Sequence, residues 1–301
     1  MHQIRSAFSQ KRSSAQLGTQ IDLYVGDCIY GMRQLEPESI DIVVTSPPYN
    51  LGIRYSSYRD DQHREAYLAW SVQWAEQVKR VLKPRGSFFL NIGAAPSNPL
   101  LPFEITDALT HDGLFVLQNS IHWIKAISIE LEDGTVLSKG HFKPINSERF
   151  INDCHEHVFH FTKEGKTRLD RLSIGVPYAD KSNIARWGHT RGKDKRCGGN
   201  TWFIPYETIR DRATQRPHPA TFPSELAERC IRLHGVTDET VMLDPFVGIG
   251  SAAVAAKNCR IRRFIGFDLD AQYLQVARER TGGSILKLEN QAALSEKPEF
   301  T

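Results

Sequence analysis

The stretch that most limits the fold of this chain is "TVMLDPFVGIGSAAVAAKNCRIRRFIGFDLD", residues 240–270. A short apolar run leads into two glycines, an Ala-rich segment of helical length and a second apolar run that ends in acidic residues. The order is strand, glycine loop, helix, strand, which is one βαβ unit. Because parallel strands need such a crossover, the stretch predicts an α/β fold with a mainly parallel sheet.

The glycine loop of this unit predicts a nucleoside site. Gly248 and Gly250 have no side chains, so a ligand can approach the backbone and the start of the helix. Asp244 ends the first strand, and Asp268 ends the second, 20 residues after Gly248. That spacing is typical of an acidic residue that binds a ribose diol. The third glycine of the dinucleotide pattern is replaced by Ala253, which favours a nucleoside such as S-adenosylmethionine; a turn without a ligand is the alternative for this loop taken alone.

The rest of the chain also alternates strands and helices. We expect strands at Ile21–Val25, Asp41–Thr45, "SFFLNIG", "LFVLQNSIHWIK" and "HEHVFHFTK", and helices from Arg64 to Leu82, in "FEITDALTHDG" and in "SELAERCIRLHG". The sequence Lys83-Pro84-Arg85-Gly86 should stop the first of these helices, and Ser224 should cap the last. Helical spacing also marks Ile29, Met32 and Leu35.

The segment "TSPPY", residues 45–49, follows the predicted strand Asp41–Thr45. Pro47 and Pro48 are stiff and lack N–H donors, so a carbonyl and the Ser46 hydroxyl remain as rigid acceptors beside the ring of Tyr49. Such a tip suits a planar group that carries an amino substituent. Alone, it also fits a stiff surface turn. Combined with the glycine loop, it predicts methyl transfer to an exocyclic amine.

These two motifs resemble the signatures of the amino-methylating DNA methyltransferases, which modify adenine N6 or cytosine N4. Ser46–Tyr49 is similar to the [DNS]PP[YF] signature, and Phe246–Gly250 to the FxGxG cofactor loop. The catalytic signature precedes the cofactor loop, as in the beta group of this family. The resemblance also includes "LYVGDCIYGMRQLEPESIDIVVTSPPYNLG", "RVLKPRGSFFLNIG", "HWIKA" and "RPHPATFPSELAERCIRLHG", and extends from about residue 21 to 280.

The resemblance implies a Rossmann-like S-adenosylmethionine-dependent fold, with a doubly wound sheet, a circularly permuted motif order and an inserted basic target-recognition region. It implies a catalytic tip of Ser46, Pro47, Pro48 and Tyr49. It implies a cofactor site made of Asp27, Asp244, Phe246, Gly248, Gly250, Asp268, His218, Pro219 and Phe222. Phe246 would contact the flipped base or the methionine part, and Asp268, which replaces the more usual Glu, the ribose.

Residues 164–202 are rich in Lys and Arg and poor in apolar positions. Within the family order, this segment is the candidate for target recognition, with Arg168, Arg171, Arg186, Arg191, Lys193, Lys195 and Arg196 on DNA. A solvated charged loop is the alternative. The whole chain has 38 basic and 35 acidic residues, so its net charge says little about DNA binding.

The expected mechanism needs no covalent intermediate. The Ser46 hydroxyl and the Pro47 carbonyl would accept hydrogen bonds from the amine of a flipped base, which would then attack the methyl group in line. A carbon-5 cytosine methylase would need a cysteine after a proline, and none of the five cysteines follows one. Ser at the first position favours cytosine N4; adenine N6 and a non-catalytic DNA-binding relative are the alternatives. The motif order disfavours a protein-glutamine methyltransferase.

We expect a flexible N-terminus (1–20), the catalytic part of one domain (21–162), the inserted region (163–205), the cofactor-binding part of the same domain (206–284) and a flexible tail (285–301). The partner is double-stranded DNA, and a separately acting restriction endonuclease and a homodimer are compatible with the family. Scattered cysteines and the lack of a long apolar run indicate a cytoplasmic protein without a membrane partner. The histidines of "CHEHVFH" do not have the spacing of a zinc site, so no metal is expected.

Overall fold

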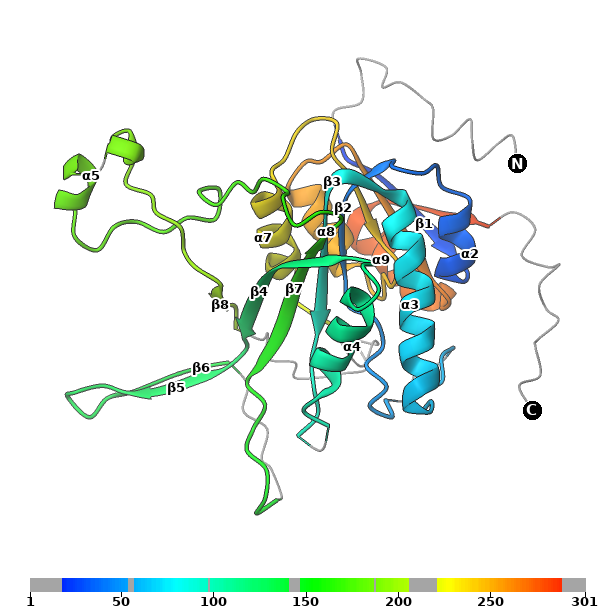
Figure 1. Cartoon of the computed structure of the whole chain (residues 1–301), viewed down its shortest axis with the longest axis horizontal. Coiled ribbons are helices and arrows are strands. Elements are labelled where there is room, and N and C mark those ends of the chain that lie inside the picture. Colours follow the sequence, from blue (N-terminus) through cyan, green and yellow to red (C-terminus); the bar gives the residue numbers. More distant parts are fainter. Residues whose placement is uncertain are drawn as a thin grey trace.

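A nine-stranded sheet forms the centre of the molecule (Figure 1). The computed structural model describes residues 18–53, 57–96, 98–140, 147–186, 188–205 and 221–288. From edge to edge, the strands are β11 (Ser284–Lys287), β1 (Gln20–Val25), β10 (Arg263–Asp268), β9 (Val241–Asp244), β2 (Ile40–Thr45), β3 (Leu82–Ile92), β7 (His155–Thr162), β4 (Val116–Ile124) and β8 (Thr201–Phe203). Neighbours from β11 to β3 are parallel, whereas β7 is antiparallel to β3 and β4. The predicted mainly parallel α/β fold is confirmed.

Helices cover both faces of this sheet (Figure 1). Helices α2 (Cys28–Arg33), α3 (Arg64–Val81) and α4 (Leu101–Thr110) pack on one face, and α7 (Ser224–His234), α8 (Ser251–Asn258) and α9 (Ala271–Thr281) on the other. Trp74 is fully buried in the first core and Leu226 in the second. Strands covered on both sides are apolar along their length, as "IDIVVT" of β2 is. The sheet is therefore doubly wound.

Strands β2 and β9 lie side by side where the chain changes direction across the sheet. After β2 the chain continues to β3 on one side, and after β9 it continues to β10 on the other. Ligands of open α/β sheets bind in the crevice at the carboxyl ends of two such strands. Thr45 Oγ1 at the end of β2 donates a hydrogen bond of 2.6 Å to Asp244 Oδ1 at the end of β9. The TSPPY tip and the glycine loop, which follow these strands, therefore meet at one crevice.

The junction between α3 and β3 differs from the prediction. Helix α3 ends at Val81, and β3 begins at Leu82 with no intervening turn. Ile40 of β2 pairs with Leu82, whereas Ile42 pairs with Ser87. Residues 83–86 therefore have no pairing partner in β2 and form an irregularity in the β2–β3 pairing. The predicted cap of α7 is also wrong, because the N-cap position is Pro223, which makes no side-chain capping bond.

The predicted tail is wrong at its start. Residues 285–287 belong to β11, which pairs in parallel with β1 at the edge of the sheet. Ile285 is partly buried against the core, which gives this short strand an apolar contact. The cofactor-binding part of the chain therefore ends with a sheet strand, and α9 supplies the crossover that leads to it.

Two segments extend outward beside the β4–β8 edge of the sheet (Figure 1). One is the hairpin of β5 (Ile127–Glu130) and β6 (Val136–Lys139), which the sequence analysis did not predict. The other contains α5 (Ser182–Arg186) and a 3-10 turn (Gly188–Thr190), and is closed by pairing between Val176 and Arg196. Both ends of the predicted insertion join the main fold, since Leu169 packs on the core and β8 pairs with β4.

Two further sequence expectations concern disulfide bonds and membrane-spanning helices. All five cysteines are free, as their scattered positions predict. Among the described residues, no helix combines the length and the apolar character that a membrane crossing requires.

His160 of β7 is expected to make the stability of the fold depend on pH. Its buried ring stacks on Phe89 with centroids 4.5 Å apart and lies within hydrogen-bond distance of Asn119 Nδ2 (2.9 Å) and Ser87 Oγ (3.0 Å). Burial lowers the pKa of His160 from 6.5 to about 3, and charge on His234 acts in the same direction. The unfolded chain takes up this proton near pH 6.5 and the folded chain does not. The contribution of His160 to the free energy of unfolding is therefore complete above pH 6.5. It decreases by about 1.4 kcal/mol for each pH unit as the pH falls towards 3.

Comparison with His160→Gln isolates this effect, because groups such as Asp244, whose pKa burial raises, change the stability in the opposite direction in both proteins. The difference in the free energy of unfolding between wild type and variant should narrow by about 1 kcal/mol for each pH unit below 6. Urea denaturation at a series of pH values measures this difference. A difference that does not change with pH would contradict a buried neutral imidazole.

Candidate active site

The tip after β2 brings its acceptor groups to the wall of a pocket at the carboxyl end of the sheet. Ser46, Pro47, Pro48 and Tyr49 all line this pocket. Tyr67 of α3 donates a hydrogen bond of 2.7 Å from Oη to the carbonyl of Pro48, which holds the tip against the helix. In the described part of the chain, the Pro47 carbonyl accepts no hydrogen bond. Ser46 and Pro47 therefore bring a hydroxyl and a carbonyl without a hydrogen bond to the residues that line the pocket.

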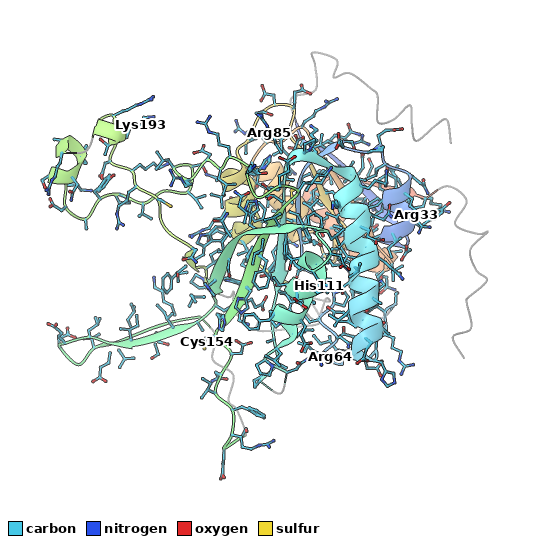
Figure 2. All side chains as sticks on the ribbon, in the orientation of Figure 1. Arg33, Arg64, Arg85, His111, Cys154 and Lys193 are labelled. Atoms are coloured by element: carbon cyan, nitrogen blue, oxygen red, sulfur yellow. The ribbon has the colours of Figure 1, made fainter. Side chains whose placement is uncertain are left out.

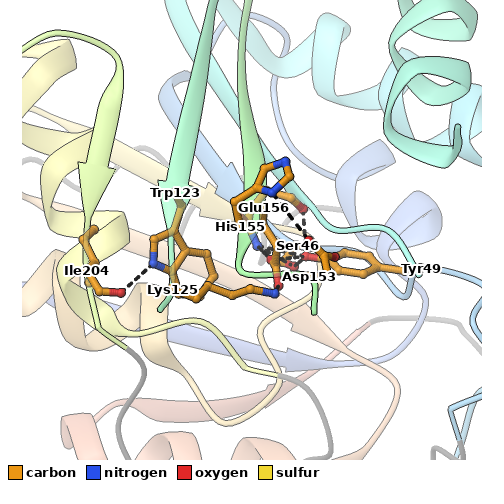
Figure 3. Close-up of polar contacts among 9 residues, drawn as sticks. Ser46, Tyr49, Trp123, Lys125, Asp153, His155, Glu156 and Ile204 are labelled. Atoms are coloured by element: carbon orange, nitrogen blue, oxygen red, sulfur yellow. Dashed lines mark hydrogen bonds and ion pairs between the residues drawn. The ribbon is translucent and has the colours of Figure 1, made fainter. Parts of the chain in front are cut away.

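A polar network lies directly behind the tip (Figure 3). Ser46 Oγ is 2.7 Å from Tyr49 Oη, and Tyr49 Oη donates to Glu156 Oε2 at 3.0 Å. Asn91 Nδ2 donates to Tyr49 Oη at 2.8 Å and to Glu156 Oε2 at 2.7 Å. Lys125 Nζ forms an ion pair of 3.1 Å with Glu156 Oε1. The tip thus ends in hydroxyl groups connected to a buried carboxylate.

A second carboxylate shapes the loop that follows the tip. Asp60 is 3% exposed and accepts hydrogen bonds from the backbone N–H groups of Asn50 (2.8 Å), Leu51 (3.0 Å) and Ile53 (3.0 Å). Burial raises the pKa of Asp60, and these three donors oppose that rise. Asn50 adopts φ 55°, a left-handed conformation that Asn tolerates better than most residues. Asp60 therefore fixes the path by which the chain leaves Tyr49.

The glycine loop connects β9 to α8 in left-handed conformations. Gly248 has φ 51° and Gly250, the N-cap of α8, has φ 82°. The N–H of Gly248 donates a hydrogen bond of 2.8 Å to Asp268 Oδ2 at the end of β10. The loop is therefore held open against the next strand. Its backbone and the start of α8 face the pocket through Gly248, Ile249 and Ser251.

Gly250→Ala is expected to destabilise the protein by about 2 kcal/mol, from backbone strain and a clash. A Cβ at this position would lie 2.7 Å from the Cβ of Ala277 in α9. Gly282→Ala is the matched control, since Gly282 has φ 75° but no atom within 4 Å of an added Cβ. Chemical denaturation should therefore show a larger loss of unfolding free energy for Gly250→Ala than for Gly282→Ala. Equal losses would mean that the contact with Ala277 has no effect.

Two carboxyl groups of the site have raised pKa values. Burial raises the pKa of Asp244 to about 7, and the nearby charge of Asp268 adds to this. Burial also raises the pKa of Asp268 to about 6, and the charge of Asp270 acts in the same direction. Asp244 Oδ2 is buried and has no hydrogen-bond partner among the described residues. Asp244 does not line the pocket; it lies beneath it and joins the tip to the glycine loop through Thr45 and Phe246 N.

The pocket contains about 1100 Å³ of space, its open mouth included. Of the predicted cofactor residues, five line it together with the four tip residues: Asp27, Phe222, Phe246, Gly248 and Asp268. Gly250 shapes the loop from behind, and His218 and Pro219 lie outside the described residues. Tyr58, Trp70 and Tyr273 also line the pocket and were not predicted. Phe246 packs on Trp70 with ring centroids 5.5 Å apart, so aromatic rings form much of one wall.

These features fit an adenosyl ligand. Flat aromatic side chains beside the glycine backbone suit a purine ring, and the carboxylates of Asp27 and Asp268, which line the pocket, suit a ribose diol. Asp268 uses Oδ2 for Gly248 N and Oδ1 for Asp270 N at 2.9 Å, yet each carboxylate oxygen can accept a further bond. Asp27 accepts from Tyr30 N through Oδ1 at 2.8 Å and can accept through its other oxygen.

The predicted DNA-binding side chains are all exposed but fall into two groups. Arg168 and Arg171 lie near the body of the fold, where they border a hollow with Gln118 and Asn119. The others, Arg186, Arg191, Lys193, Lys195 and Arg196, lie on the projecting segment, and Lys193 is far from the sheet (Figure 2). Lys181 and Asp194 form an ion pair of 2.6 Å there, so the segment is not purely cationic.

Sequence reasoning missed the residues behind the tip. Asn91, Lys125 and Glu156 come from β3, the end of β4 and β7, and nothing in their spacing connects them to Ser46. One signal was available: a polar residue inside an apolar strand, as in "SFFLNIG" and "HEHVFHF", indicates a buried group with a specific partner. No cluster of three or more His, Cys, Asp or Glu side chains suited to a metal ion occurs in the part of the chain that the structure describes.

Comparisons with known proteins identify the family of this chain. A family model described as DNA methylase, for N6 and N4 methyltransferases, matches residues 40–279. The Type II methyltransferase M.HpaI of Haemophilus parainfluenzae is 28% identical over 261 residues, which are 86% of this chain and 73% of that protein.

Two solved structures share the fold. The cytosine-N4-specific PvuII DNA methyltransferase has a TM-score of 0.65 at 21% identity and covers 91% of this chain and 89% of its own. The Thermus thermophilus protein TTHA0409, in complex with S-adenosyl-L-methionine, has a TM-score of 0.59 at 26% identity and covers 89% of this chain and 98% of its own. With its family model matched over most of its length, the chain belongs to the DNA methylases that methylate adenine N6 or cytosine N4.

Proposed function

We propose that this protein transfers a methyl group from S-adenosyl-L-methionine to N4 of cytosine at a specific site in double-stranded DNA. The observation that carries this proposal is that the SPPY tip and the glycine loop, about 200 residues apart in the chain, line one pocket. An acceptor site for an amine and a site for an adenosyl group are therefore adjacent. S-adenosylmethionine supplies an electrophilic methyl group.

The tip activates the amine by accepting its hydrogen bonds. An exocyclic amine is a poor nucleophile because its lone pair is delocalised into the ring. Hydrogen bonds to the Ser46 hydroxyl and the Pro47 carbonyl favour a tetrahedral nitrogen whose lone pair can attack in line. Preorganised acceptors of this kind need no covalent enzyme intermediate, and no cysteine lines the pocket next to a proline.

Reaching the amine requires a flipped base, because the duplex encloses it. Tyr49 offers its ring to the flipped base next to the two acceptors. Stacking on an aromatic ring is worth about 1–3 kcal/mol per base, which offsets a large part of the cost of unstacking. In the adenosyl part of the pocket, Asp268 holds the ribose and Asp27 lies near the adenine ring. Asp244 and Gly250 hold the loop in shape, and Phe222, with the predicted His218 and Pro219, completes the wall.

The basic segment binds the DNA backbone and target sequence. Its exposed cations are Arg186, Arg191, Lys193, Lys195 and Arg196, with Arg168 and Arg171 closer to the fold. Removing one cation that binds a phosphate should reduce the slope of log affinity against log salt by about 0.9. Replacing Arg191, Lys193 and Lys195 by Ala should therefore reduce the slope of log affinity against log salt by about 2–3. Fluorescence anisotropy with duplex DNA at several salt concentrations measures this slope. An unchanged slope would remove this segment from the DNA interface.

Nucleoside mass spectrometry tests the proposed function. Bacterial DNA is incubated with S-adenosylmethionine and the wild-type protein or Ser46→Ala, and then digested to nucleosides. We expect 4-methylcytosine with the wild type and little with the variant. 6-Methyladenine in its place would make adenine N6 the target. DNA that gains neither product, although the protein binds cofactor, would indicate a non-catalytic DNA-binding relative.

The proposed activity takes place in the cytoplasm, where the protein meets its DNA. A cytoplasmic site of action agrees with the five free thiols and gives access to DNA. In a restriction-modification system, the partner would be a restriction endonuclease that cuts the same sequence and acts separately. Assembly into a homodimer is testable by light scattering.

A further inference from the structure

We propose that Glu156 is a positioning residue for methyl transfer. It fixes the direction of the hydrogen bonds of Tyr49 and Ser46, so that Ser46 Oγ meets the target amine as an acceptor. It also receives, through these two hydroxyls, the proton that the amine loses. This inference rests on the proposed function of the tip, and it adds a residue from β7, more than 100 positions later in the chain, to the reacting groups.

Glu156 lies in a nearly closed environment next to the tip. Its side chain is 11% exposed and accepts hydrogen bonds at both oxygens, from Tyr49 Oη and Asn91 Nδ2 at Oε2 and from Lys125 Nζ at Oε1. Gly93 leaves the space for this arrangement, because a Cβ there would lie 3.0 Å from both Glu156 Cγ and Tyr49 Cε2. All three partners are donors, which is the arrangement that an ionised carboxylate requires.

These donors determine which way the hydroxyl protons point. Tyr49 has one proton, and the oxygens near it include Ser46 Oγ at 2.7 Å, Glu156 Oε2 at 3.0 Å and the Asn91 carbonyl at 3.3 Å. We assign this proton to Glu156 Oε2, because a carboxylate accepts a hydrogen bond more strongly than a hydroxyl does, and the proton of Tyr49 then points away from Ser46. The contact of 2.7 Å between the two hydroxyls is then a bond donated by Ser46 Oγ to Tyr49 Oη. With its proton directed inward, Ser46 Oγ presents only lone pairs to the pocket.

The same chain can remove a proton. When the amine nitrogen bonds to the methyl carbon, the carbon–sulfur bond breaks, the sulfur becomes a neutral thioether and the nitrogen becomes positively charged. The nitrogen transfers a proton to Ser46 Oγ while the Ser46 proton moves to Tyr49 Oη and the Tyr49 proton to Glu156 Oε2. Both hydroxyls end neutral and Glu156 ends as a carboxylic acid, so charge and protons balance. A weakly basic serine thereby acquires the basicity of a carboxylate.

A purely structural ion pair is the alternative role for Glu156. The structure contains a comparable pair elsewhere, between Asp22 of β1 and Arg263 of β10, whose side chains are 7% and 9% exposed and do not line the pocket. Asp22→Asn therefore makes the same chemical change, carboxylate to amide, in a buried pair outside the site. It is the matched control for the loss of such a pair.

The test measures the single-turnover rate of radiolabelled methyl transfer to target DNA at saturating cofactor, from about pH 5.5 to 8.5. We expect Glu156→Gln to lower the rate about a hundredfold at pH 7.5, a magnitude typical of lost acid–base assistance. Cofactor and DNA dissociation constants should stay within about twofold. The titratable and charged groups around Glu156 are Lys125, Tyr49 and His157. A rate that falls across this pH range while both dissociation constants hold is a loss of chemistry and not of binding.

Two further variants distinguish relay from structure. Asp22→Asn should keep the wild-type rate within about twofold, whatever it does to stability. The double variant Glu156→Gln with Lys125→Met removes the cation that the single variant leaves unpaired, and should stay as slow as the single variant. A Glu156→Gln rate within about threefold of the wild-type rate would overturn the inference while the proposed function stands. Recovery of the wild-type rate in the double variant would have the same consequence. If the wild type transfers no methyl group, the proposed function fails and the inference fails with it.

Discussion

Tyr49→Ala should lower the single-turnover rate of methyl transfer by at least about a thousandfold while leaving cofactor affinity within about threefold of wild type. The variant loses the stacking surface for the flipped base, worth about 1–3 kcal/mol, and the hydroxyl that connects Ser46 to Glu156. Removal of one preorganised polar group from a reacting centre commonly costs about 100-fold to 1000-fold in rate. Rapid-quench measurements with radiolabelled cofactor, and calorimetry without DNA, give the two quantities.

Tyr49→Phe is the matched control for this prediction. It keeps the ring and removes only the hydroxyl, so base flipping should persist while the rate still falls by about 10-fold to 100-fold. Fluorescence of 2-aminopurine at the target position reports flipping separately from chemistry. If Tyr49→Phe has the full wild-type rate, the hydroxyl network behind the tip has no part in the reaction. If Tyr49→Ala is as active as wild type, the tip is not the reacting centre.

Asp268→Asn should weaken cofactor binding by about tenfold at pH 7.5. Hydrogen bonds from a ribose diol to a carboxylate are worth about 1.5–3 kcal/mol each, roughly twice those to a neutral amide. Burial raises the pKa of Asp268 to about 6 in the cofactor-free protein. Ligand hydroxyls favour the ionised form, so wild-type affinity should rise between about pH 5 and pH 7 as Asp268 loses its proton. Titration calorimetry across this range measures both effects.

In Asp268→Asn the part of this pH dependence due to Asp268 should be absent. Asp244 also titrates, with its pKa raised to about 7, but it is present in both proteins and cancels in the comparison. Asp112→Asn, at an exposed position outside the pocket, controls for the change in net charge. Equal affinities for wild type and Asp268→Asn at every pH would exclude Asp268 from the ribose site.

The elements predicted from the sequence were those whose pattern is local. The strand, glycine loop, helix and strand of residues 240–270 appear as β9, α8 and β10, because apolar runs and glycines in sequence determine such a unit. The abrupt start of β3 at Leu82 was not predicted, since only the ladder with β2 accommodates residues 83–86. The hairpin of β5 and β6 could have been recognised from its alternating pattern around Asp133-Gly134.

The chemical identities of the tip and the loop were readable in the sequence, because they depend on a few consecutive residues. Two prolines set backbone angles by themselves, and glycines permit the positive φ values of 51° and 82° found at Gly248 and Gly250. Their arrangement in one pocket was not readable, because it depends on β2 and β9 becoming neighbours across about 200 residues of chain.

The sequence by itself determined the fold class, the two motifs and the family, because each motif rests on residues close together in the chain and the family on the order of such motifs. The tertiary structure decided what stands behind the tip, and separated the predicted DNA-binding cations into two groups. It also placed Asp244 beneath the pocket rather than in its wall. Asn91, Lys125 and Glu156 gather behind Ser46 and Tyr49 only because β3 and β4 end where β7 begins. Hydrogen bonds and ion pairs act over a few ångströms, so a partnership between residues distant in sequence exists only once the sheet has brought them within that range.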